Sequence, residues 1–143
     1  MNNKYLIKNE KEMIDLGVEF SKKLKPQDTV LLFGELGSGK TTFTKGIAKG
    51  LKIKERIVSP TFILIRSYKI AKNIIKTLYH VDLYRIEKSA STPELAITDL
   101  LNDENGIVVI EWPEIIEKVI NTKVWKLHFK YNENERNVEI KYE

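Results

Sequence analysis

Residues 34–41 read Gly-Glu-Leu-Gly-Ser-Gly-Lys-Thr, and this stretch decides the fold that we expect. It matches the phosphate-loop pattern G-x-x-x-x-G-K-[ST] at every defined position. In such a loop the glycines let main-chain N–H groups approach phosphate oxygens, and the next helix points its positive N-terminus at the same place. The pattern therefore predicts a site for a nucleoside triphosphate and Mg²⁺.

The segments beside the loop support this prediction. An apolar run from Thr29 to Phe33 precedes it, as expected of a strand buried in a parallel sheet, and a helix is predicted from Lys40 to Leu51. We expect Lys40 to reach the β- and γ-phosphates of ATP and Thr41 to offer its hydroxyl to Mg²⁺. The residues expected to bind the nucleotide here are Leu36, Gly37, Ser38, Gly39, Lys40, Thr41 and Thr42. For Thr42, simple packing in the helix is an equal alternative.

The remaining patterns predict an α/β protein. The expected strands are 4–7, 29–33, 62–70, 74–81, 107–110, 123–131 and 137–142, with a hairpin tip at 72–73, and the expected helices are 10–24, 40–51, 92–101 and 113–120. The chain contains no linker or repeat. We therefore expect one domain over residues 1–143, with the P-loop NTPase fold. Its mixed, largely parallel sheet should be flanked by helices and end in a C-terminal β-hairpin.

Composition excludes several classes. The chain has no Cys, which rules out disulfides and thiolate metal sites, and its 42% hydrophobic content is that of a globular protein. No apolar run approaches the ~20 residues that span a bilayer, and the first residues lack a signal-peptide pattern. We expect a cytoplasmic protein without membrane association.

Two acids follow apolar runs. Asp82 comes after residues 78–81, and Glu111 comes after residues 107–110. An acid at a neighbouring strand end often holds Mg²⁺, directly or through water. The run before Glu111 is the cleaner buried strand, so we predict Glu111 as a metal ligand and Asp82 as the group that positions or deprotonates a water or binds Mg²⁺ through water. A surface carboxylate or a helix cap is the alternative for each acid.

Other nucleotide enzymes fit less well. Residues 103–106 formally match D-x-x-G but precede their strand, and N-K-x-D occurs nowhere, so ATP is favoured over GTP. No Arg-rich lid is recognisable, which leaves a small-molecule kinase as an alternative only. A nucleotide-dependent binding switch with incidental hydrolysis is the other alternative.

Taken together, the motifs resemble one family. They are residues 34–43, Ser-Pro-Thr-Phe at 59–62, His-Val-Asp-Leu-Tyr-Arg at 80–85 and Glu-Trp-Pro at 111–113. In order and spacing they are similar to the TsaE (YjeE-type) ATPases over almost the whole chain. The resemblance implies an Mg-dependent ATPase, slow alone, that acts with TsaD and TsaB in threonylcarbamoylation of the tRNA adenosine next to the anticodon. It leaves direct contact with tRNA open.

The resemblance also implies roles for single residues. Asp82, Thr61 and Lys40 would be catalytic, with Thr61 in a switch-like loop facing the γ-phosphate. Arg136, late in the last hairpin, would contact the nucleotide, and Glu10 would border the adenine.

Two further features have open interpretations. His80 should point the same way as Asp82, because they lie two residues apart on a strand. It could orient Asp82, contact a partner or be a core histidine. The group Lys45, Lys49, Lys52 and Lys54 is interpreted mainly as a solvated face, with an approach to tRNA or an acidic partner as the alternative.

Overall fold

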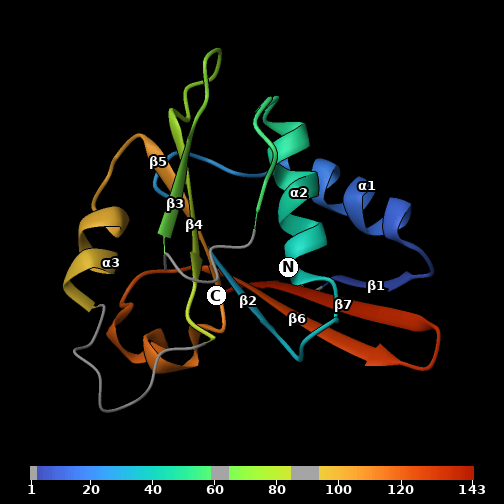
Figure 1. Cartoon of the computed structure of the whole chain (residues 1–143). Coiled ribbons are helices and arrows are strands. Elements are labelled where there is room, and N and C mark those ends of the chain that lie inside the picture. Colours follow the sequence, from blue (N-terminus) through green and yellow to red (C-terminus); the bar gives the residue numbers. More distant parts are fainter. Residues whose placement is uncertain (1–2, 59–64, 85–93) are drawn as a thin grey trace.

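The computed structural model describes residues 3–58, 65–84 and 94–143 (Figure 1). Its seven-stranded sheet has the order β1-β7-β6-β2-β5-β4-β3. The strands are β1 Asn3–Ile7, β2 Thr29–Gly34, β3 Ile65–Lys69, β4 Thr77–Asp82, β5 Gly106–Glu111, β6 Trp125–Asn132 and β7 Glu135–Tyr142. The helices are α1 Glu10–Ser21, α2 Lys40–Gly50 and α3 Glu94–Leu101, with two 3₁₀ helices, η1 Pro113–Ile115 and η2 Glu117–Val119.

The sheet is mixed, as predicted, but it is not largely parallel. Strands β6, β2, β5 and β4 pair in parallel, while β1–β7, β6–β7 and β3–β4 pair antiparallel. Half of the six pairings are therefore antiparallel, because a hairpin occupies each end of the sheet. Strand β5, which lies between β2 and β4, is buried at all six residues, as a parallel strand covered on both faces should be.

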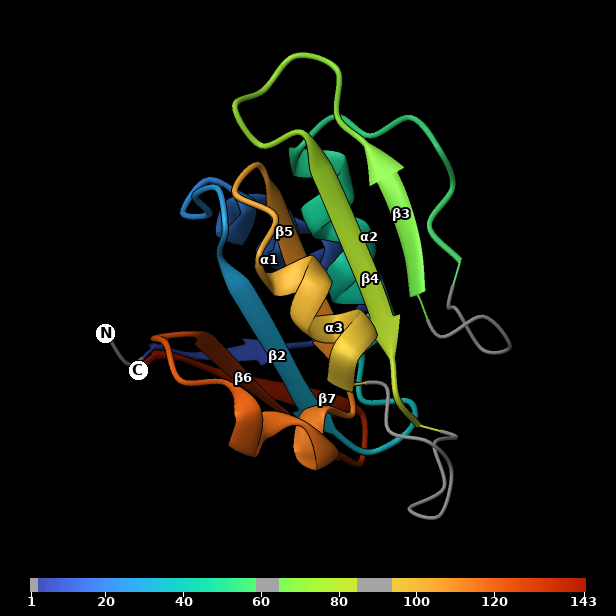
Figure 2. The same cartoon turned by 90° about the vertical axis from the view of Figure 1, so that its left-hand side faces the viewer.

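Helices cover both faces of the sheet (Figure 2). On one face α1 and α2 pack through residues such as Met13, Phe20 and Phe43. On the other face α3 contributes Ile97, and the turn between the two 3₁₀ helices contributes Ile116, to a second core cluster. The parallel centre is thus enclosed, and its strand ends open toward the loops that carry the predicted site.

Two glycines bring α1 and α2 into backbone contact. A Cβ on Gly17 would lie 2.4 Å from the carbonyl oxygen of Phe43, and one on Gly46 would lie 2.3 Å from that of Ile14. No larger side chain fits either position without moving a helix. This contact holds α2, and the loop before it, against α1.

Several predicted boundaries were wrong. Strand β4 begins at Thr77 instead of residue 74, because residues 70–76 make the hairpin turn, closed by the Ile70 N–H bond to Lys76. Helix α1 ends at Ser21, three residues before the predicted end. The helix expected at 113–120 is two 3₁₀ helices that follow Trp112, a residue with positive φ. The predicted helix start at 92–93 lies outside the described residues.

Candidate nucleotide-binding site

A cavity of about 650 Å³ lies where β2, β5 and β4 end. The phosphate loop follows β2, Glu111 ends β5 and Asp82 ends β4, and all three parallel strands end at the same edge of the sheet. The lining residues are Asn9, Glu10, Met13, Leu36, Gly37, Ser38, Gly39, Lys40, Thr41, Thr42, Asp82, Tyr84, Glu111, Trp112 and Arg136. Every predicted site residue in the described part of the chain is among them. Thr61 lies outside the described residues.

The loop has the backbone that its glycines permit. Gly37 and Gly39 have φ angles of 77° and 107°, a region that L side chains rarely adopt. Within the described part of the chain, the buried hydroxyl of Ser38 has no hydrogen-bond partner. Buried polar groups are normally paired, so this hydroxyl fits a loop that holds a polar ligand.

Lys40 is buried among loop carbonyls and an aromatic ring. Its Nζ donates to the carbonyl oxygen of Gly34 and, at 3.4 Å, to that of Glu35. The same nitrogen lies 3.7 Å from the centre of the Trp112 ring. Burial lowers the pKa of Lys40, although the nearby carboxylates of Glu111 and Asp82 act in the opposite direction. The Lys40 amine thus lies buried at the side of the cavity formed by the loop and Trp112.

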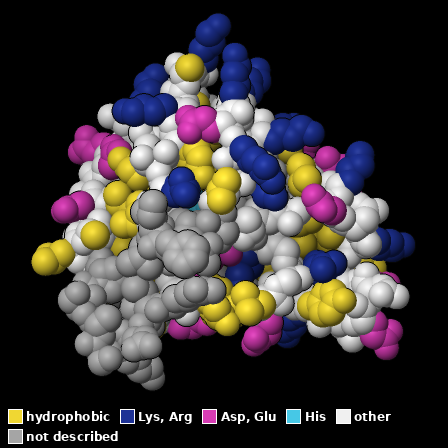
Figure 3. Space-filling model, in the orientation of Figure 1, with side chains coloured by type: hydrophobic (Ala, Val, Ile, Leu, Met, Phe, Trp, Pro, Cys, Tyr) yellow, Lys and Arg dark blue, Asp and Glu magenta, His cyan; other side chains and the backbone are white. Residues whose placement is uncertain are grey.

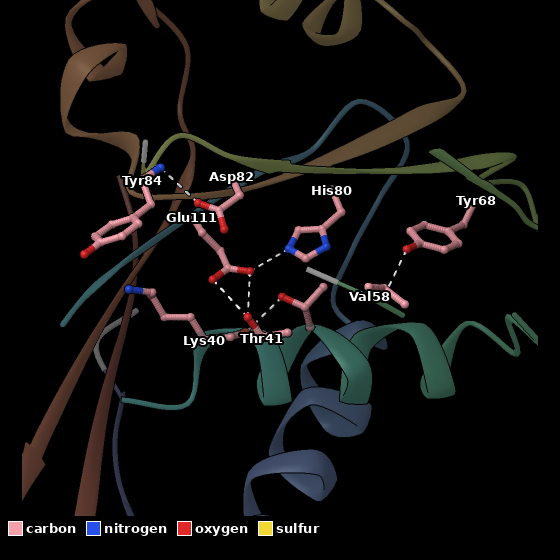
Figure 4. Close-up of polar contacts among 9 residues, drawn as sticks. Lys40, Thr41, Val58, Tyr68, His80, Asp82, Tyr84 and Glu111 are labelled. Carbon is pink, nitrogen blue, oxygen red and sulfur yellow. Dashed lines mark hydrogen bonds and ion pairs between the residues drawn. The ribbon is translucent and has the colours of Figure 1, made fainter. Parts of the chain in front are cut away.

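Three polar side chains form a chain beneath the cavity (Figure 4). The Thr41 hydroxyl lies 3.1 Å from both carboxylate oxygens of Glu111, to which it donates. The second of these oxygens lies 2.6 Å from Nε2 of His80. Glu111 is 3% exposed and His80 is fully buried. Glu111 is therefore held from two sides, by α2 and by β4.

The hydrogen bonds assign the tautomer of His80. Because a carboxylate oxygen accepts, Nε2 is the ring nitrogen that carries a proton and donates it to Glu111. Nδ1 is buried and has no partner in the described part of the chain, which suits a bare lone pair better than an N–H group. His80 thus donates from Nε2 to Glu111. The interpretation that it orients Asp82 is wrong, because the longer Glu111 side chain extends from the neighbouring strand to the imidazole.

Two aromatic side chains and Asp82 border the cavity. The Asp82 Oδ1 accepts a 2.9 Å hydrogen bond from the backbone N–H of Tyr84. The Tyr84 and Trp112 rings lie 4.9 Å apart, and Trp112 has a φ of 57°, which is costly for a bulky residue. The turn after β5 therefore places the Trp112 ring over Lys40.

The opposite side of the cavity comes from the two ends of the chain. Arg136 on β7 donates from Nε to the carbonyl oxygen of Gly37 at 3.1 Å. Glu10 is the first residue of α1, and sequence patterns missed its lining neighbours Asn9 and Met13. Asn9 could have been found as the cap of this helix, since its side chain accepts from the N–H of Glu12.

The donor set fits Mg²⁺ only as a site shared with a ligand. No group of three or more His, Cys, Asp or Glu side chains in the described ranges could hold a metal ion. Thr41 and Glu111 supply hard oxygen atoms, and Mg²⁺ commonly completes its shell with phosphate oxygens and waters.

Among the described helices, none has the length and apolar character needed to cross a membrane.

Comparisons with known proteins agree with this architecture. A family model described as "Threonylcarbamoyl adenosine biosynthesis protein TsaE" matches residues 7–138. The chain is 35% identical to the tRNA threonylcarbamoyladenosine biosynthesis protein TsaE of Rickettsia prowazekii (strain Madrid E), over 92% of this chain and 89% of that one. It is 37% identical to the protein of the same name from Nostoc sp. (strain PCC 7120), over 96% and 84%.

A solved structure is also similar. The crystal structure of YdiB from Bacillus subtilis superposes with a TM-score of 0.78, covering 98% of this chain and 84% of that chain at 28% sequence identity. The resemblance inferred from the motifs is thus confirmed. This chain belongs to the TsaE family of tRNA threonylcarbamoyladenosine biosynthesis proteins.

Proposed function

We propose that this chain binds ATP and Mg²⁺ in the cavity and hydrolyses the ATP while serving, with TsaD and TsaB, the threonylcarbamoylation of the tRNA adenosine next to the anticodon. One observation carries the ATPase part: Thr41 of the phosphate loop is bonded to the buried Glu111, and both line the same cavity as Lys40. This is the arrangement of residues that a magnesium–triphosphate ligand requires.

Each side chain has a proposed task. Lys40 exchanges its loop carbonyls for β- and γ-phosphate oxygens and neutralises their charge. Thr41 and Glu111 hold Mg²⁺, which when bound neutralises charge on the transferring phosphoryl group. Asp82 orients a water for attack. Most of the rate enhancement then comes from positioning and electrostatics.

The rest of the ligand follows from the lining. Arg136 contacts the phosphates from the Gly37 side, and Glu10 lies toward the adenine, at the start of α1. Thr61 is proposed to face the γ-phosphate, by resemblance to the family alone. Lys40 and Arg136 are the two cations of the described lining, and both are engaged by loop carbonyls. We therefore propose slow hydrolysis by the isolated chain and faster hydrolysis in the assembly.

Phosphate release from Mg-ATP tests the proposal. It is measured for the protein alone and with TsaB, TsaD and tRNA, with Lys40→Ala as the control. Slow release that the partners accelerate and the variant abolishes is the expected result. Normal release by Lys40→Ala would overturn the site, and no acceleration by the partners would remove the proposed assembly.

A non-hydrolysable ATP analogue separates hydrolysis from mere occupancy. An ATPase that must turn over cannot sustain repeated modification cycles with the analogue. Full multiple-turnover modification with the analogue would show instead that nucleotide binding alone is the function.

A further inference from the structure

The positive charge of the chain is concentrated in two segments. Residues 45–58 and 66–76 hold nine of the 24 Lys and Arg residues but only one of the 20 Asp and Glu residues. Their formal charge is +8, which leaves −4 on the rest of a chain whose total is +4. The excess positive charge is thus local. We name these residues the basic cap: Lys45, Lys49, Lys52, Lys54, Arg56, Arg66, Lys69, Lys72 and Lys76.

All nine side chains of the basic cap are available to a partner. Each is exposed, and none forms an ion pair with another residue of the described ranges. Elsewhere in these ranges five lysines, Lys4, Lys11, Lys22, Lys126 and Lys141, pair with carboxylates, while others such as Lys118 and Lys130 form no ion pair with a described residue. Within the described part of the chain, the cap cations therefore lack carboxylate partners at ion-pair distance.

The two segments form one surface. The N–H of Val58 donates to the Tyr68 hydroxyl at 3.3 Å, which ties the stretch after α2 to β3 (Figure 4). Buried residues from both segments, among them Ile57 and Ile70, share one core cluster. Figure 3 shows Lys and Arg side chains gathered over the β3–β4 hairpin and the nearby end of α2. Folding has brought both segments to the same end of the molecule.

The basic cap also contains a groove and an exposed apolar side chain. A groove of about 380 Å³ is edged by Lys45, Lys49, Lys52 and Lys54, with Ala48, Ile53 and Ile57 along it. At the hairpin turn, Ile74 is 72% exposed between Lys72 and Lys76. An apolar side chain among lysines suits a ligand that combines phosphates with flat bases or sugars.

The basic cap lies away from the nucleotide cavity. Helix α2 starts at the phosphate loop and its 11 residues span roughly 16 Å; Lys45 and Lys49 lie along it, and the other seven cap residues follow its end in the sequence. None of the cap residues lines the nucleotide cavity. A ligand on the cap therefore leaves room for ATP.

We infer that the basic cap is a docking surface for the phosphate backbone of RNA, with transfer RNA as its ligand. The inference rests on the pathway in which this family acts, and not on ATP hydrolysis. Charge complementarity favours RNA over an acidic protein, because nine exposed cations with one acid, none of the nine ion-paired within the described residues, match a continuous polyanion better than a protein surface of mixed charge. The basic cap would thus add binding affinity for the RNA backbone that does not depend on the RNA sequence.

Salt-dependent binding of fluorescein-labelled, unmodified tRNA tests this inference. The full chain is compared with the triple variant Lys54→Glu, Lys72→Glu and Lys76→Glu by fluorescence anisotropy between low and physiological salt. The matched control is Lys118→Glu, Lys123→Glu and Lys130→Glu, which changes three exposed lysines elsewhere and lowers the net charge equally. We expect the cap variant to bind about tenfold or more weakly, with a log–log salt slope reduced by about 2–3.

Each outcome decides the inference. Binding by the control that equals the wild type, together with loss in the cap variant, supports RNA docking. Equal binding by the two variants, or no tRNA binding by the wild type at low salt, overturns it. Cap-dependent binding of poly-glutamate or of phosphatidylserine vesicles without tRNA binding would assign the cap to a protein or a membrane instead. ATP hydrolysis by the cap variant is measured in parallel, and we expect it to be unchanged, so that failure of the proposed ATPase is distinguishable from failure of RNA docking.

Discussion

His80 provides the sharpest test of how the proposed metal site is built. The change His80→Leu keeps an apolar side chain in a fully buried position but removes the donor that lies 2.6 Å from Glu111. Glu111 is 3% exposed, so water cannot easily replace the lost bond. A hydrogen bond to a charged group contributes about 1.5–3 kcal/mol. Loss of the partner that orients a metal-ligating side chain typically weakens metal binding about 10–100-fold.

The prediction is therefore a rise of about 10–100-fold in the Mg²⁺ concentration needed for half-maximal nucleotide binding and hydrolysis. Nucleotide binding without Mg²⁺ should change little, because Lys40 and the loop N–H groups are untouched. The assay is a Mg²⁺ titration followed by the fluorescence of Trp112, whose ring lies 3.7 Å from Nζ of Lys40.

The chain supplies a matched control. His128→Leu removes the other histidine, which stacks on Phe33 at a ring distance of 4.7 Å and has no contact with Glu111. His80→Gln restores an N–H donor and should recover part of the Mg²⁺ affinity. The reasoning is refuted if folded His80→Leu protein keeps the wild-type Mg²⁺ midpoint, or if both histidine variants lose affinity equally.

Three further predictions concern stability. Lys40→Met should raise the melting temperature at pH 7, because burial lowers the folded-state pKa of Lys40 and its charge opposes folding. Thermal denaturation should show this gain in melting temperature shrinking as the pH approaches the unfolded pKa of about 10.4. A lower melting temperature at pH 7 would contradict the prediction. Gly46→Ala should cost roughly 1–3 kcal/mol in urea denaturation, because its Cβ would lie 2.3 Å from the Ile14 oxygen, and an unchanged midpoint would show that the helices move apart freely. Tyr79→Phe removes the 2.6 Å hydrogen bond that holds the pKa of Asp103 below its usual value. At this partly exposed site the change should lower the free energy of unfolding by under about 1 kcal/mol at pH 7, and by less as the pH falls below the unfolded pKa of about 3.9 toward the lower folded pKa. A loss of stability that grows in acid would exclude this mechanism.

Local patterns determined the part of the site that is contiguous in sequence. Residues 34–41 carry the loop, and the strand before it and the helix after it were predicted almost to the residue. Glu111 and Asp82 were predicted because each acid follows an apolar run, and the carboxyl ends of parallel strands meet at one edge of a sheet. Side-chain spacing and turn residues act over a few positions, so they can be read from the sequence alone.

Tertiary structure decided which distant residues meet. Arg136 bonds to a loop residue 99 positions away, a contact for which only family resemblance offered a hint. The His80–Glu111 pair depends on the register of β4 against β5, and the basic cap depends on the stretch after α2 lying beside β3. Apolar patterns mark each strand but leave strand order and register open, because one buried strand resembles another. The sheet must form before these side chains acquire their partners.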